Sequence, residues 1–171
     1  MAYSNSGRLG CNISATYTSA EAQLLGHSVG TLTFAQHGQI YEFVQALSTV
    51  AQYDAVAFLG NTSASDDIVC KVAPLETTNG VLTAKVGIAQ VAITSGDYGW
   101  VAINGGQLQV KALIACQPAV PLYATATAGS VDDAIISTAG IVGLIALQSA
   151  TSASAITCIA AFPHIGFLRG A

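Results

Sequence analysis

The stretch from residue 85 to residue 129 constrains the fold most, because short apolar segments alternate there with turn-forming residues. Turns are expected at 94–97, at Asn104-Gly105-Gly106 and at Gln117-Pro118, about one for every ten residues. This spacing is typical of an antiparallel β-sandwich or a small barrel. The segments predicted as strands are KVGIAQVAI (85–93), YGWVAI (98–103), LQVKALIA (108–115) and PLYATAT (121–127).

The whole chain divides into an N-terminal arm, residues 1–28, and the β domain, residues 29–171. The arm is rich in Ser, Asn, Gly, Thr and Ala, and its only predicted helix covers 19–25 and ends near Gly26. It is either a disordered terminus or a strap that orders on a neighbouring subunit. Strands are predicted at 29–34, 38–46, 53–59 and 68–75, and Asn79-Gly80 predicts a hairpin turn. The β domain forms one barrel or two packed β lobes.

The longest uncharged stretch, between Asp133 and His164, is long enough to cross a bilayer. Its apolar part, 134–147, is interrupted by hydroxyl and glycine residues, and the polar segment 148–154 follows it. We therefore expect a strand, a polar turn and a second strand, and no membrane span. The alternative is one or two helical turns at 132–137.

The composition favours a protein whose surface is largely covered by partner subunits. Charged residues make up 8% of the chain and hydrophobic residues 52%, so that an isolated subunit would lack the usual charged surface. A homo-oligomer or a larger lattice would cover the apolar exterior. The formal net charge is −4 and the five basic residues are widely spread. This excludes the basic patch that nucleic-acid or acidic-membrane binding requires.

Catalytic and metal-binding patterns are missing from the sequence. The three histidines, at 27, 37 and 164, fall in separate turns. Each is expected to be solvated or to form hydrogen bonds with nearby groups. The pairs Asp66-Asp67 and Asp132-Asp133 are interpreted as exposed turns, with a calcium loop as the alternative. The four cysteines form no C-x-x-C pair, so we expect reduced thiols, with Cys116 and Cys158 buried within strands. We predict no enzyme activity, no metal and no cofactor.

Four segments resemble a known family. They are GQIYEFVQA (38–46), Gly87-Ile88-Ala89, SGDYGWV (95–101) and PLYATATAGSVDD (121–133). Together they look like the head decoration, or capsid cement, proteins of tailed bacteriophages, over most of residues 30–165. The resemblance implies a β-rich subunit, made in the host cytoplasm, that binds the major capsid protein on the outer surface of the assembled virion and stabilises the shell. It also implies a symmetric homo-oligomer, with a trimer favoured.

Aromatic and arginine residues near the two termini are the candidate contacts with that partner, because such side chains are frequent interface anchors. Trp100, between two turn segments, is predicted to be a core anchor. The candidate contact residues are Tyr3, Arg8, Tyr17, Phe167 and Arg169.

Three other functions remain open from the sequence. A spike or fibre module that binds receptors or glycans would also be β-rich, although its exposed aromatic residues should cluster, whereas Tyr and Phe are scattered along this chain. A self-assembling shell or tail subunit would polymerise alone. A carrier of small molecules would need a roomy barrel with convergent polar groups.

Overall fold

The computed structural model describes residues 11–59, 70–78, 84–134 and 140–166, and every structural statement below concerns these residues. They form β-strands with one short α-helix and one 3₁₀-helix. In chain order the elements are α1 (Ser19–Leu25), β1 (Leu32–Phe34), η1 (Gln36–Gly38), β2 (Ile40–Ala46), β3 (Ala55–Leu59), β4 (Lys71–Pro74), β5 (Val86–Ala89), β6 (Tyr98–Ala112), β7 (Leu122–Ala124), β8 (Val131–Asp132), β9 (Gly140–Ala146) and β10 (Ser154–Gly166).

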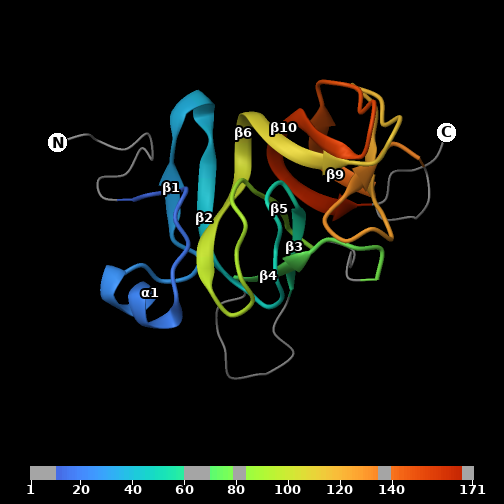
Figure 1. The fold of residues 1–171 in the computed structure, drawn as a ribbon. Helices are drawn as coiled ribbons and strands as arrows, with labels where there is room; N and C mark the ends of the chain where they lie inside the picture. Colours follow the sequence, from blue (N-terminus) through green and yellow to red (C-terminus); the bar gives the residue numbers. More distant parts are fainter. Residues whose placement is uncertain (1–10, 60–69, 79–83, 135–139, 167–171) are drawn as a thin grey trace.

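Strand β6 belongs to two closed rings of strands. The first ring runs β2, β4, β3, β5, β6 and back to β2. The second ring runs β6, β10, β9, β7, β8 and returns to β6 through the pairing of Ala112 with Val131. Figure 1 shows β6 between β1–β2 and α1 on one side and β9–β10 on the other. The all-β barrel predicted from the sequence is confirmed.

The predicted turn at 104–106 is wrong, because β6 continues through it. Gly105 has a φ of +118° and Gln107 a φ of 57°, and the pairing register shifts on both sides of the strand here. A Cβ atom on Gly105 would lie 2.5 Å from the Cα of Gln39, so that only glycine fits. These residues therefore form a bulge that bends one long strand from the first ring into the second.

Other expectations are confirmed, revised or left untested. Most pairings are antiparallel as predicted, but β2 pairs with β4 in parallel and β6 with β8 in parallel. The uncharged stretch forms strands β9 and β10 around a polar turn, as predicted, with Ile159 opposite Ile145. The alternative helix at 132–137 does not start where expected, because Asp132 lies in strand β8. Residues 135–139 lie outside the described part. The hairpin predicted at Asn79-Gly80 also lies outside it.

No helix in the described part of the chain has the length and apolar character needed to cross a membrane.

The hydrophobic core has two parts because neighbouring residues of a strand point to opposite faces. In β6, Val101 and Ile103 belong to the cluster that also holds Val44 and Val72, in the first ring. Trp100 and Ala102 belong to the other cluster. After the bulge the same cluster continues along β6 and into the second ring, through Leu108, Val110, Leu122, Leu144, Cys158 and Ile165.

The N-terminal segment packs against this second cluster. The helix predicted at 19–25 is confirmed: Thr18 and Glu21 form a capping box, and Gly26 ends the helix at a φ of 64°. Cys11 and Ala22 are buried in the core. The backbone N–H groups of Tyr17 and Tyr98 each donate to the other's carbonyl oxygen over 2.8 Å. Residues 11–28 thus pack on the β domain of their own chain.

Candidate functional site

The outer face of β9 and β10 exposes three large aliphatic side chains next to one another. Ile145 and Ile159 are directly paired across the strands, and the Leu147 N–H donates to the Thr157 carbonyl oxygen two residues further along. All three side chains therefore project from one face, and they are exposed by 48% (Ile145), 47% (Leu147) and 41% (Ile159). We call these three residues the apolar triad. Side chains of this size expose apolar surface that a partner could cover.

A row of amide side chains adjoins the apolar triad. Gln109 lies beside Thr157 across β6 and β10, and its Nε2 donates to the Thr157 Oγ1 over 3.0 Å. Gln90 Nε2 donates to the Gln109 carbonyl oxygen over 2.9 Å, and Gln52 Nε2 donates to the Gln90 carbonyl oxygen over 3.1 Å. We call Gln52, Gln90 and Gln109 the glutamine ladder. These hydrogen bonds fix side chains that would otherwise lose rotamer entropy on contact with a partner.

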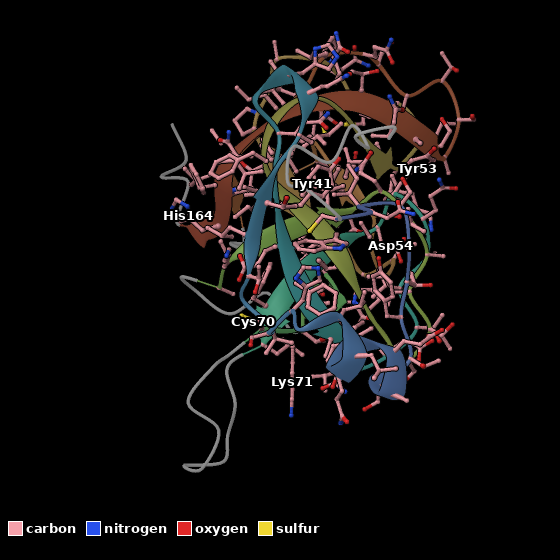
Figure 2. All side chains as sticks on the ribbon, turned by 90° about the vertical axis from the view of Figure 1, so that its left-hand side faces the viewer. Tyr41, Tyr53, Asp54, Cys70, Lys71 and His164 are labelled. Atoms are coloured by element: carbon pink, nitrogen blue, oxygen red, sulfur yellow. The ribbon has the colours of Figure 1, made fainter. Side chains whose placement is uncertain are left out.

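The apolar triad and the glutamine ladder carry no charge, and the neighbouring Lys111 is paired with a carboxylate. Lys111, two residues beyond Gln109, places its Nζ 2.6 Å from Oδ1 of Asp54. Asp54 is 5% exposed at its side chain and also accepts the Ala51 N–H over 2.7 Å. Figure 2 shows Asp54 and the neighbouring Tyr53 on the same side of the molecule. A charge-free surface of this kind can be covered by a partner without desolvating an ion.

Other exposed apolar side chains are dispersed over the fold. Leu24 lies on α1, Phe34 on β1 and Ile114 in the loop after β6. Phe162 lies at the register shift within β10, where its φ is 47°. In β1, Leu32 and Phe34 are exposed and flank the fully buried Thr33.

One cluster of potential metal ligands occurs in the described ranges. A ligand atom of Cys116, one of Asp132 and one of Asp133 lie within 4.8 Å of one another. Asp132 lies in β8 and is 8% exposed, so the expectation of an exposed turn is wrong for it. Burial raises the pKa of Asp132 and, with the nearby carboxylates, raises that of the Cys116 thiol to about 11. With no ion bound, the Cys116 thiol is therefore protonated at neutral pH. Asp66-Asp67 lies outside the described residues.

Four cysteines are buried and free of disulfides. Cys158 lies in β10 as predicted, whereas Cys116 lies in the loop after β6. Cys70, just before β4, donates to Oε1 of Glu42 over 3.3 Å, and Oε2 of the same carboxylate pairs with Lys85. The Lys85 ammonium also lies 4.5 Å from the centre of the Phe58 ring. The buried Glu42 carboxylate therefore has both a hydrogen-bond donor and a cation as partners, at one end of the first ring.

Buried thiols make the fold sensitive to alkaline pH. Burial, as the main cause, raises the pKa of Cys70 to about 11 and that of Cys158 to about 12, whereas an exposed thiol ionises near pH ~8.5. The stabilisation from each neutral thiol is complete below the pKa of the unfolded chain and is lost as pH rises through the folded value. Urea unfolding should give a lower free energy at about pH 10.5 than at about pH 8. Cys158→Ala should weaken this pH dependence; an unchanged free energy in the wild type would contradict the prediction.

The structure places two of the six residues singled out from the sequence. Trp100 is 2% exposed, with its ring centre 5.0 Å from that of Phe43. Tyr17 is half-buried, with its ring centre 6.1 Å from the same phenyl ring. The proposed contacts Tyr3, Arg8, Phe167 and Arg169 lie outside the described residues.

Two of the three histidines differ from their sequence interpretation. His27 is in the core-facing aromatic group, with its ring centre 5.6 Å from that of Trp100 and its Nε2 3.6 Å from the Cys11 sulfur. His164 lies within strand β10 and not in a turn. His37 lies in η1 with a φ of 58°.

Sequence reasoning missed the apolar triad and the glutamine ladder. Strand β9 is apolar on both faces, so alternation does not reveal which side is exposed. The available signal was the lack of charge between Asp133 and His164.

The fold and its outer face define an all-β barrel protein with a second ring of strands fused through β6. Among solved structures, the chain is similar to the N base of the head fibre gp8.5 of bacteriophage phi29. The TM-score is 0.51 at 17% sequence identity, and the likeness covers 74% of this chain and 97% of the fibre base. No protein-family profile and no curated protein sequence matches the chain. The likeness is thus one of fold.

Proposed function

We propose that the protein is a structural component of a phage virion that binds the outer surface of the assembled head and stabilises it. The observation that carries the proposal is the shared fold with a head-fibre base, of which nearly the whole length is matched. The segments at 95–101 and 121–133, which resemble those of decoration proteins, support the same location. The major capsid protein is the proposed partner, and the subunit acts as a homo-oligomer, with a trimer favoured.

The apolar triad and the glutamine ladder are the proposed contact face. Their side chains combine exposed aliphatic surface with amides that are already held by hydrogen bonds. Covering such a face gains hydrophobic free energy without desolvating a charge. Low charge over the whole chain is consistent with a subunit that works inside an assembly.

Stabilisation of the head follows from mass action. A subunit that binds the assembled shell and not its separated parts stabilises it by about 2.7 kcal/mol per site at a free concentration a hundredfold above Kd. Symmetric repetition multiplies this contribution over the shell. Catalysis has no part in this role.

Replacing Ile159 with aspartate is expected to weaken binding to undecorated phage heads about tenfold or more, because the interface would bury an unpaired carboxylate. Co-sedimentation with heads measures the bound fraction. The matched control is Phe34→Asp, which adds the same charge at an exposed residue of β1, away from the apolar triad. Equal binding by wild type and Ile159→Asp would refute the contact face, and no binding by wild type would refute the head role.

A self-assembling shell or tail subunit is the alternative, since the apolar triad could equally meet other copies of this chain. Measuring the mass of the purified protein without heads separates the two. A small closed oligomer supports decoration, whereas sheets or tubes would overturn it.

A further inference from the structure

One buried carboxylate of the β domain differs from the others in its partners. Of the three buried carboxylates in the described ranges, Glu42 pairs with Lys85 and Asp54 pairs with Lys111. Asp132 is 8% exposed, and no described lysine, arginine or histidine forms an ion pair with it. A buried carboxylate without a cation is costly unless it takes up a proton or binds a metal ion. The surroundings of Asp132 therefore favour a positively charged ligand.

Two further ligand groups converge on this carboxylate. A ligand atom of Cys116, one of Asp132 and one of Asp133 lie within 4.8 Å of one another. The Cys116 side chain is fully buried, and its Sγ makes only a distant contact, 3.9 Å from the Gln117 carbonyl oxygen. The Asp132 Oδ1 accepts the Asp133 N–H over 2.9 Å, a bond within the cluster itself. One sulfur and two carboxylates thus face one another without a neutralising cation among the described residues.

Backbone hydrogen bonds hold the two halves of the cluster together. The cysteine lies in the loop after β6, and the aspartates lie in β8 and in the bend that follows it. The Leu113 N–H donates to the Val131 carbonyl oxygen over 2.9 Å, and the Gln117 N–H donates to Oδ2 of Asp133 over 3.2 Å. The loop is therefore fixed against β8 before an ion arrives. Because the cysteine and the aspartate pair are far apart in sequence, no metal-binding motif is visible there, and the sequence predicted no metal.

We propose that Cys116, Asp132 and Asp133 bind one zinc ion. Calcium and magnesium take oxygen ligands, whereas zinc accepts both cysteine sulfur and carboxylate oxygen. Ligand atoms in a tetrahedral zinc site are about 3.5 Å apart, so that side-chain movements of about 1 Å close the cluster around the ion. On binding, the Cys116 thiol releases its proton to solvent and its sulfur bonds to zinc. Water occupies the fourth position, beside the half-buried Asp133.

Zinc at this place would strengthen the narrowest closure of the second ring. Strands β6 and β8 pair through Ala112 and Val131 alone. A zinc ion bound by the loop after β6 and by β8 joins the same two elements a second time. The ion therefore stabilises the fold, because a metal that binds the folded chain adds its binding free energy to folding. This role goes beyond attachment to the head and does not depend on it.

The test is a titration of the purified full chain, first freed of metal by a chelator, with zinc and separately with cobalt(II). Cobalt(II) accepts the same ligands as zinc and absorbs visible light. We expect one zinc per chain with a Kd of about 1 µM or tighter, and a thiolate-to-cobalt charge-transfer band. Excess calcium should not displace zinc. No zinc binding, no charge-transfer band, or displacement of zinc by calcium would overturn the proposal.

Variants locate the site. Cys116→Ser should abolish the charge-transfer band and weaken zinc binding about a hundredfold, because a hydroxyl is a much poorer zinc ligand than a thiolate. Asp133→Asn keeps an oxygen that can accept the Gln117 N–H and should weaken zinc binding about tenfold. The matched control is Cys158→Ala, which removes another buried thiol and should leave both the Kd and the band unchanged.

A thermal unfolding experiment measures the effect of zinc on the fold. Zinc should raise the melting temperature of the wild type and of Cys158→Ala, and raise that of Asp133→Asn less. An unchanged zinc Kd in Asp133→Asn, or a charge-transfer band that persists in a folded Cys116→Ser, would contradict the site. Co-sedimentation with heads is measured separately, so that a failure of head binding and a failure of zinc binding are distinguishable.

Discussion

Replacing Trp100 with alanine is expected to lower the free energy of unfolding by about 3–5 kcal/mol, the range for removing a buried aromatic side chain. Trp100 lies on the outer face of the first ring, in contact with both the Phe43 ring and the His27 ring. Its removal opens a cavity between the barrel and the N-terminal segment. Residues 11–28 should therefore also lose protection against hydrogen exchange.

Trp100→Phe is the matched control for this prediction. The indole N–H has no hydrogen-bond partner in the described structure, so phenylalanine deletes no hydrogen bond and keeps an aromatic contact with Phe43. Its cost should be well below that of alanine. Urea unfolding followed by far-UV circular dichroism measures both variants without a tryptophan signal. An alanine variant within about 1 kcal/mol of wild type would show that Trp100 does not anchor the core.

Replacing Lys111 with methionine is expected to destabilise the fold by about 3 kcal/mol, because it leaves the buried Asp54 carboxylate without its cation. Asp54 lies just before β3 in the first ring, and Lys111 near the end of β6, where β6 pairs with the second ring. The carboxylate has little room to move, since a Cβ added to Gly129 would lie 2.3 Å from its Cγ. The expected value is at the lower end of the range for broken buried pairs because the Lys111 side chain is 36% exposed.

A double-mutant cycle distinguishes an ion pair from simple packing. Asp54→Asn removes the charge and keeps the shape, so that Asp54→Asn with Lys111→Met should be more stable than the sum of the two single effects implies. Chemical unfolding of the four proteins gives the coupling free energy. Additive losses would mean that the contact contributes through packing alone.

Local patterns predicted the elements whose causes are local. The helix at 19–25 has its capping box and its terminal glycine in the adjoining sequence, and the β9–β10 pair follows from apolar segments around a polar turn. The bulge at Gly105 was predicted as a turn because Asn-Gly-Gly is typical of hairpins. What prevents the reversal is pairing with β2 and β10, and neither partner is near in sequence.

The candidate sites were harder to predict than the strands. Ile145 and Ile159 resemble core residues, and only the strand register shows that they share an exposed face. The aromatic residues, scattered in sequence, gather in space: Tyr17, Tyr98, Trp100 and His27 surround or adjoin Phe43. Such convergence depends on long-range pairing.

The sequence by itself determined an all-β chain of low charge with a short capped helix, because alternation, turn residues and caps act over a few neighbouring residues. Only the tertiary structure decided that β6 is shared by two rings, that Asp132 is buried, and that an uncharged face forms over β9 and β10. These features depend on which distant strands pair and in which register. A shift of one residue would exchange the buried and exposed faces.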